Sequence, residues 1–268
     1  MIETRRALIF GLLLAALCSG LAAATAARAE TSDWAENEGG RMRMVALPPD
    51  ASGSVRALLE IEPKPGWITY WREPGESGIP PQVSVSGGAA LGSLAYPVPK
   101  VLRLGTLRDV GYDGPAALPV TLQSVTGPAK VDVFIGLCKQ ICIPFQASFP
   151  LGLAVTAAKA EEVLRIDAAV ARLPAAIAPD LAVTRATIKS RVLTLDVVAP
   201  EGSGKVEAIV TGPPGGVFLA EGSVEKPGKT TLSFPLDALD PAKDPAGIAW
   251  SVLLKAGELA AEQKITLE

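Results

Sequence analysis

Residues 131–146 read VDVFIGLCKQICIPFQ, and this stretch predicts two strands joined by a tight turn. Its first half alternates apolar with other residues up to Ile135, as in a strand with one buried face. Three residues separate Cys138 from Cys142, which is the right number for a hairpin connection. A helical turn would also bring the two sulfurs together, but the flanking β-branched residues argue against a helix. Both sulfurs are therefore expected at the mouth of two paired strands.

The same strand pattern recurs on both sides of this hairpin. From Arg41 to Val155, short apolar or alternating runs are broken by turns rich in proline and glycine. Six or more such strands indicate a β-sandwich. A second series of strand patterns extends from Leu181 to Leu267 and contains neither cysteine nor histidine. We therefore expect an all-β protein with two sandwich domains, in which any chemistry lies in the first.

One segment between the two series has the period of a helix. Its apolar residues recur at steps of three and four, glutamates stand in its first turn, and a proline stops the pattern. The residues that carry this pattern are Val163, Ile166, Val170, Leu173 and Pro174. We expect a short amphipathic helix that connects the domains. The expected division is a signal segment at 1–29, a first domain at 30–155, a helical linker at 156–179 and a second domain at 180–268.

The first 29 residues predict an export signal. Two arginines precede an apolar run from Ala7 to Ala24, and Ala27-Arg28-Ala29 places small residues before a cleavage point at Glu30. The alternative is an uncleaved anchor, because a run of this length is borderline for a membrane span. After cleavage we expect no stable membrane insertion and an oxidising compartment.

The composition excludes several classes of function. The 268 residues include no histidine, so a Ser-His-Asp or Cys-His hydrolase cannot be built, nor can a metal site that needs imidazole ligands. The net charge is -3, which gives no electrostatic support for binding a phosphate backbone. We expect no nucleic-acid partner, no cofactor and no metal site.

Cys138 and Cys142 are the two cysteines that remain once Cys18 leaves with the signal. They should pair in an oxidising compartment. The loop they close is so short that chain entropy accounts for only about 2 kcal/mol of stabilisation. A disulfide on a turn is also more open to exchange than one between distant segments. Lys139 could favour the thiolate of its neighbour Cys138.

Three functions are compatible with this pair. The bridge exchanges with other thiols, or it only stiffens a loop of a binding or scaffold module, or the reduced pair carries Cu(I). Two thiols do bind Cu(I), with Met42 and Met44 as the remaining soft ligands. Taken alone, the cysteine pair leaves the structural and the exchange interpretations open.

Four segments together resemble a known family. They are GWITYWREPGESGIPP at 66–81, YPVP at 96–99, GYDG at 111–114 with LPV at 118–120, and GLCKQICIP at 136–144. In this order, over residues 34–155, they resemble the N-terminal periplasmic domain of the thiol:disulfide interchange reductases of the DsbD/ScsB family. The second domain is similar to the extra module of longer, ScsB-like N-terminal regions.

The resemblance implies immunoglobulin-like sandwiches and a periplasmic location. It also implies that Cys138 and Cys142 receive electrons from a membrane-embedded or thioredoxin-like donor and pass them to periplasmic acceptors. By this analogy partners attack Cys142, and Cys138 closes the pair. We therefore expect a thiol–disulfide exchange protein that acts as a component of a protein-disulfide reductase.

The sequence departs from the family in two respects. The DsbD domain has five residues between its cysteines, whereas this chain has three, as in the ScsB-like branch. The chain also lacks the multi-span membrane module and the thioredoxin module of those reductases, so the electron donor is expected on another polypeptide. The family's cap loop over the disulfide corresponds to about Leu102 to Arg108, without the acidic and aromatic residues of that cap.

Several residues near the motifs are predicted by position. Tyr112, in a turn flanked by glycines, is expected near the disulfide. Pro144 is expected to restrict the strand edge or to hold the loop after Cys142. In a strand through the first aromatic block, Trp67, Thr69 and Trp71 point one way and Ile68 and Tyr70 the other, so these side chains are expected to pack in the core.

Overall fold

The computed structural model describes residues 30–104, 107–153, 157–176, 178–212, 216–223, 228–237, 239–240, 242, 244, 248–265 and 267. Regular structure in these residues is almost entirely β-strand, and every pairing between named strands is antiparallel. Within this part of the chain no helix is both long and apolar enough to cross a membrane. The expected signal segment, residues 1–29, lies outside the described residues.

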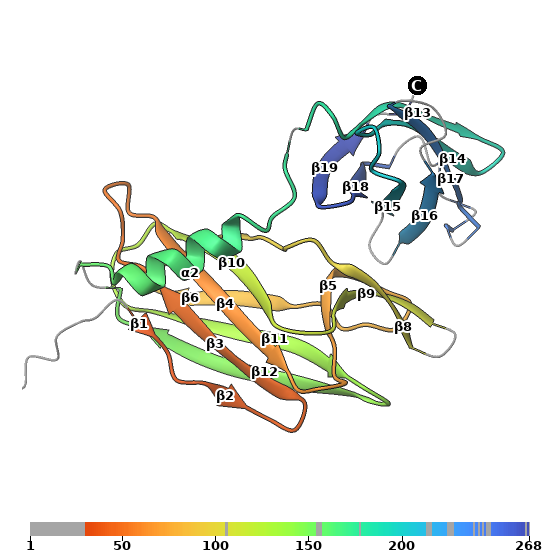
Figure 1. The fold of residues 1–268 in the computed structure, drawn as a ribbon. Helices are drawn as coiled ribbons and strands as arrows, with labels where there is room; N and C mark the ends of the chain where they lie inside the picture. The colour runs from red at the N-terminus through yellow and green to blue at the C-terminus, as the bar shows by residue number, and fades with distance from the viewer. Residues whose placement is uncertain are drawn as a thin grey trace, which may run out of the picture.

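The first domain contains three sheets (Figure 1). The largest has the order β1-β3-β4-β10-β7, with β2 on β3: β1 (Glu30–Thr31), β2 (Ala35–Glu36), β3 (Gly40–Ala46), β4 (Val55–Pro63), β7 (Ala90–Leu94) and β10 (Ala116–Gln123). The second is β12 (Cys142–Leu151), β11 (Ala129–Cys138) and β6 (Gln82–Gly87). The third is β5 (Thr69–Gly75), β9 (Leu107–Tyr112) and β8 (Lys100–Leu104).

One core joins the facing sheets of this domain. Apolar residues on alternating positions of β3, β4, β10 and β11 point inward, as the period of two in a strand requires. Met42 and Met44 are fully buried in this core. Trp67 and Trp71 belong to the same core, whereas Ile68 and Tyr70 pack in a separate cluster with Cys138. The expected division of the aromatic block between two faces is therefore confirmed.

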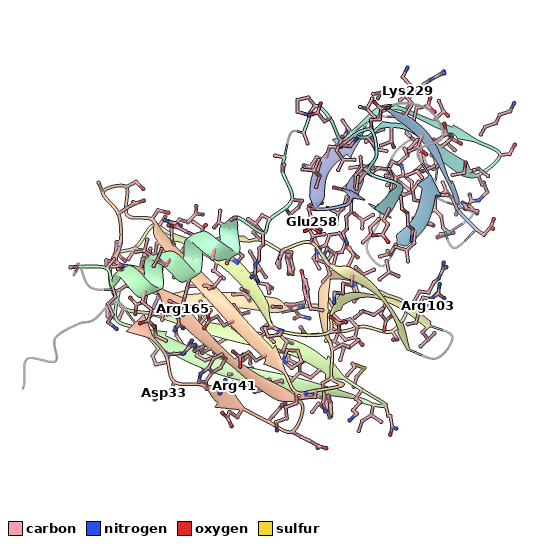
Figure 2. All side chains as sticks on the ribbon, viewed as in Figure 1. Asp33, Arg41, Arg103, Arg165, Lys229 and Glu258 are labelled. Carbon is pink, nitrogen blue, oxygen red and sulfur yellow. A yellow bond between two sulfur atoms is a disulfide. The ribbon has the colours of Figure 1, made fainter. Side chains whose placement is uncertain are left out.

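The predicted helix is present as α2 (Ala160–Val170), and it packs on the outer face of the largest sheet. Ile166 and Ala169 contact a cluster that includes Val45 and Leu58. Arg165 of α2 lies over this sheet (Figure 2) and reaches Glu60 of β4 at 3.6 Å. Val170 was expected on the apolar face but is exposed, because the helix presents Ala169 instead.

The second domain is a smaller sandwich of two sheets. One is β13 (Ala182–Lys189), β14 (Val192–Val198) and β17 (Lys229–Pro235). The other is β16 (Val217–Ser223), β15 (Lys205–Thr211), β18 (Trp250–Ala256) and β19 (Leu259–Ile265). Its core contains Trp250, whose ring meets the edge of Phe218 at a centroid distance of 5.8 Å. The prediction of an all-β chain with two immunoglobulin-like sandwiches and one short helix is confirmed.

The two sandwiches touch through β5 and β19. The guanidinium group of Arg72 stacks on Trp71 at 3.8 Å and pairs with the carboxylate of Glu262. Ile209 and Leu253 of the second domain join the apolar core of the first. The second domain therefore contacts β5, the strand that also carries Tyr70.

The packing of α2 predicts a difference between two substitutions on the same helix. Ile166→Ala removes a buried side chain from the interface with β3 and β4, and should lower the free energy of unfolding by about 2–5 kcal/mol. Leu164→Ala changes an exposed side chain, so its effect should stay within about 0.5 kcal/mol. Urea unfolding followed by tryptophan fluorescence measures both, and equal midpoints would show that α2 is not docked.

Candidate disulfide site

The cysteine hairpin has the predicted form. β11 ends at Cys138, β12 begins at Cys142, and the two residues pair across the ladder. The connection of three residues is closed by the N–H of Lys139, which donates to the carbonyl of Ile141 at 3.1 Å. The two sulfurs are bonded, and the Cα atoms lie 4.0 Å apart.

The backbone of Cys138 bonds to Ile68, the residue just before β5, rather than to β12. Its N–H donates to the carbonyl of Ile68 at 3.0 Å, and its carbonyl accepts the N–H of Ile68 at 2.8 Å. Because both groups face β5, Cys138 and Cys142 occupy a non-hydrogen-bonded position, where opposite side chains lie closest. Thr69 adds a buried bond from its hydroxyl to the carbonyl of Gly136 at 3.1 Å. These contacts fix the disulfide to the rigid sheet.

The two cysteines differ in their access to solvent. Cys138 is 1% exposed and packs with Ile68 and Tyr70, whereas Cys142 is exposed. Disulfide exchange requires a thiolate to approach one sulfur, and access decides which. Of the two cysteines, Cys142 is therefore the one that an incoming thiolate can approach.

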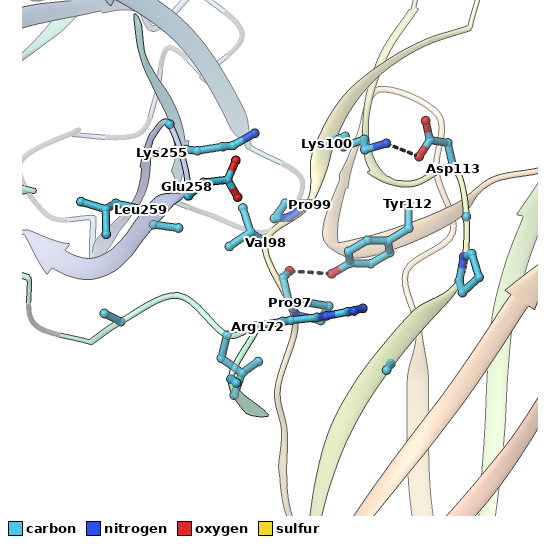
Figure 3. Close-up of a pocket in the computed structure, with 18 residues that line it drawn as sticks. Pro97, Val98, Pro99, Lys100, Tyr112, Asp113, Arg172, Lys255, Glu258 and Leu259 are labelled. Atoms are coloured by element: carbon cyan, nitrogen blue, oxygen red, sulfur yellow. Dashed lines mark hydrogen bonds and ion pairs between the residues drawn. The ribbon is translucent and has the colours of Figure 1, made fainter. Parts of the chain in front are cut away.

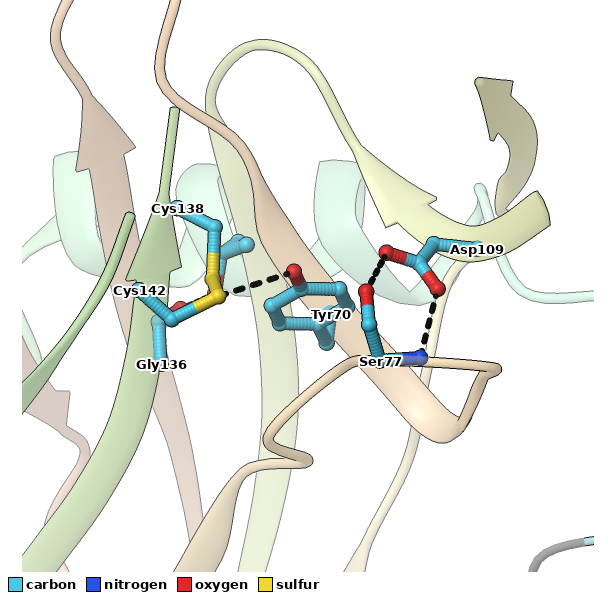
Figure 4. Close-up of a disulfide and its surroundings, with 7 residues drawn as sticks. Tyr70, Ser77, Asp109, Gly136, Cys138 and Cys142 are labelled. Carbon is cyan, nitrogen blue, oxygen red and sulfur yellow. Dashed lines mark hydrogen bonds between the residues drawn. A yellow bond between two sulfur atoms is a disulfide. The ribbon is translucent and has the colours of Figure 1, made fainter. Parts of the chain in front are cut away.

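Tyr70 places a hydroxyl beside the exposed cysteine. Its oxygen lies 3.6 Å from Sγ of Cys142 (Figure 4). Because a disulfide sulfur carries no hydrogen, the hydroxyl is the donor in this contact. Burial of the ring, and then the negative charge of Asp109, raise the pKa of Tyr70 to about 12. The phenol is therefore protonated at neutral pH and can donate to a thiolate on Cys142.

The buried carboxylate of Asp109 holds the segment that packs against Tyr70. Asp109 is fully buried in β9 and accepts both the N–H of Ser77 at 3.0 Å and its hydroxyl at 2.7 Å (Figure 4). These bonds hold the segment after β5 against the tyrosine. A Cβ on Gly78 would lie 2.4 Å from the Tyr70 ring, so only glycine lets the backbone pass this closely.

A hollow of about 500 Å³ surrounds the disulfide, and its lining includes Ser77, Leu107 and both cysteines. Its rim presents apolar side chains to solvent: Ile141 at the hairpin tip is 69% exposed, and Leu107 on the β8–β9 hairpin is also exposed. Exposed apolar side chains that gather on one surface are typical of a contact with another protein.

The structure places the other expected residues as follows. Lys139 is exposed in the hairpin turn and lines the same hollow. Pro144 is exposed on β12, opposite Gly136, and β12 is an edge strand. By the alternation of the ladder, its nitrogen faces away from β11, so the missing N–H costs no pairing.

Tyr112 is not placed beside the disulfide. It lies in β9, and its hydroxyl donates to the carbonyl of Pro97 at 2.9 Å (Figure 3). Its ring lines a cavity of about 700 Å³ that also includes Arg172 and residues of the second domain. The tyrosine beside the disulfide is Tyr70 and not Tyr112. The reason is that Ile68, just before β5, pairs with Cys138, whereas the turn after β9 does not.

The expected cap stretch, Leu102 to Arg108, falls in the β8–β9 hairpin, with residues 105–106 outside the described residues. Its Leu107 reaches the disulfide hollow. Sequence reasoning missed Tyr70, Ser77 and Asp109. The signal available for Tyr70 was its alternation with Trp71, which points it away from the main core.

Metal ligands do not gather at this site. Within the described part of the chain, no three Cys, Asp or Glu side chains lie together as a metal centre would require. The two methionines considered for copper, Met42 and Met44, are fully buried in the apolar core of the first domain.

Comparisons with known proteins agree on the first domain. Residues 42–153 match the family model described as thiol:disulfide interchange protein DsbD, N-terminal. The fold is similar to the crystal structure of the N-terminal periplasmic domain of ScsB from Proteus mirabilis, with a TM-score of 0.74 and 22% identity. That match covers 90% of this chain and 99% of the other. No functionally curated protein sequence matches the chain.

The unequal burial of the cysteines predicts unequal thiol reactivity. In Cys138→Ala the remaining Cys142 is exposed and should react readily with Ellman's reagent under native conditions. In Cys142→Ala the remaining Cys138 is buried and should react roughly tenfold more slowly, or slower still. Release of the coloured thiolate measures both rates, and the same reaction in denaturant confirms that each variant carries one free thiol. Similar native rates would contradict the assigned asymmetry.

Proposed function

We propose that this protein is a periplasmic thiol–disulfide exchange protein that relays electrons through Cys138 and Cys142, a function supported by the match of residues 42–153 to the DsbD N-terminal family model. The observation that carries the proposal is the asymmetry of the bridge, in which Cys142 is exposed whereas Cys138 is buried and bonded to Ile68. A staple inside a folded body needs no open sulfur, whereas exchange does.

The proposed reduction proceeds in two substitutions. A thiolate of a partner dithiol attacks Sγ of Cys142, the bond between the two cysteines breaks, and its electron pair leaves on Cys138 as a thiolate that takes up a proton. The second thiol of the partner then attacks the partner sulfur that is bonded to Cys142, and Cys142 is released from the mixed disulfide. The partner is oxidised to a disulfide, and this protein gains two electrons and two protons as a dithiol.

Tyr70 assists the step that releases Cys142. Its hydroxyl, 3.6 Å from the sulfur in the oxidised protein, donates to the thiolate as it forms. The reverse sequence delivers the electrons: the thiolate of Cys142 attacks an acceptor disulfide, and Cys138 resolves the mixed disulfide.

The rim supports partners that are themselves folded proteins. Ile141 and Leu107 offer exposed apolar contacts at the hollow, and Lys139 adds a positive charge at the hairpin tip. We propose that thioredoxin-like or membrane-embedded thiol–disulfide proteins dock here, with Cys142 at the centre of the contact.

Redox titration tests the proposed function. The mature protein is equilibrated in glutathione buffers of increasing ratio, free thiols are trapped by alkylation, and the dithiol fraction is measured by mass. We expect the bridge to open and close with the ratio while tryptophan fluorescence stays that of the folded protein. A bridge that stays closed until the protein unfolds would exclude exchange and leave a structural staple.

Tyr70→Phe tests the role of the hydroxyl, with Tyr112→Phe as the matched control. Both variants are made in a Cys138→Ala background that carries glutathione on Cys142, and removal of the Tyr70 hydrogen bond should slow release of Cys142 by dithiothreitol roughly three- to tenfold. Tyr112 bonds a backbone carbonyl at Pro97, so its variant should release Cys142 at the rate of the parent that keeps both tyrosines. Stopped-flow fluorescence gives both rates, and the assignment of Tyr70 fails if both variants match this parent.

A further inference from the structure

The carboxylate of Glu162, in the first turn of α2, is buried with one oxygen unsatisfied. The residue is 2% exposed. Oε1 accepts the hydroxyl of Thr31 at 3.0 Å and the ammonium group of Lys159 at 3.2 Å. Oε2 is buried and has no hydrogen-bond partner among the described residues. A buried carboxylate oxygen without a hydrogen-bond donor costs free energy. We therefore expect a group close to Oε2 that can donate a hydrogen bond to it.

The neighbour of Glu162 is the first strand of the described chain. Thr31 of β1 makes the contact, and Glu30 precedes it by one residue, about 3.3 Å along a strand. Glu30 pairs with Ala46 of β3, and Ser32 donates its N–H to Met44 at 2.8 Å. By the alternation of the ladder, the backbone nitrogen of Glu30 faces the carbonyl of Ala46.

We propose that Glu162 is the binding site for the α-ammonium group that signal removal creates on Glu30. Hydrolysis of the bond between Ala29 and Glu30 consumes one water and leaves a carboxylate on Ala29 and an ammonium group on Glu30. An amide nitrogen has one hydrogen, which the carbonyl of Ala46 takes. An ammonium group has three, so it keeps this bond and has donors left for Oε2 of Glu162.

The site therefore distinguishes the processed chain from its precursor. Only the processed chain carries a positive charge at this position, and only it satisfies the second oxygen. The groups already present balance the carboxylate in part: Lys159 is bound to the other oxygen, and the N-terminus of α2 is the positive end of the helix. The new ion pair would fasten β1 to α2, independently of the chemistry at the disulfide.

Chemical labelling of the N-terminal amine tests this proposal. The mature protein, with Glu30 confirmed as its first residue by mass spectrometry, is treated at pH 7.5 with the N-hydroxysuccinimide ester of acetate. At pH 7.5, which is close to the ordinary pKa of an α-amine, an ion pair that raises this pKa by about one unit lowers the reactive fraction of the amine about sevenfold. We therefore expect acetylation about sevenfold slower in wild type than in Glu162→Gln, which keeps the acceptor for Thr31. Glu161→Gln alters an exposed glutamate of the same turn and should match wild type.

Equal labelling rates in wild type and Glu162→Gln would overturn the proposal, as would a mature protein that begins at another residue. A variant with Gly-Ser before Glu30 leaves Glu162 intact and moves the ammonium group away. This extended chain should label as fast as Glu162→Gln, and it remains informative if that substitution fails to fold. Protection of the extended chain equal to that of wild type would also contradict the assignment.

Discussion

Two backbone hydrogen bonds between Ile68 and Cys138 set the geometry of the whole site. They are 2.8 and 3.0 Å long and join the start of β5 to the end of β11, where β6 no longer pairs with β11. Because they engage both backbone groups of Cys138, the disulfide partner must stand at a non-hydrogen-bonded position on the other side. They also align β5 so that Tyr70, on the same face as Ile68, reaches the sulfur of Cys142. This one contact between strands thus determines that Cys138 is buried, that Cys142 is exposed and that Tyr70 lies beside Cys142.

Much of the fold could be predicted from local sequence alone. The hairpin of residues 131–146 follows from alternation and from a connection of three residues, both of which are properties of neighbours in the chain. The helix α2 follows likewise from its period. The residues on its buried face were predicted less well. Val170 was expected to be buried but is exposed, and the smaller Ala169 is buried instead.

The neighbours of the disulfide depended on strand order, which alternation does not specify. Tyr112 and Tyr70 lie in adjacent strands, and Tyr112 pairs directly with Thr69. Only the pairing of Ile68 with Cys138 decides that β5, and not the end of β9, approaches the sulfurs. The support from Asp109 and Ser77 is equally non-local, since these residues are 32 positions apart and meet through the third sheet. Sequence reasoning located the cysteine pair but not its surroundings.

The disulfide joins residues only four positions apart, and the apolar core of the first domain is built without its sulfurs. Opening the bridge releases a loop whose closure is worth only about 2 kcal/mol of chain entropy. Neither sheet is tied to another by this bond, so no layer separates when it breaks. Because the bond lies within one hairpin, breaking it frees only the three residues of the turn and does not require the sandwich behind the tip to refold.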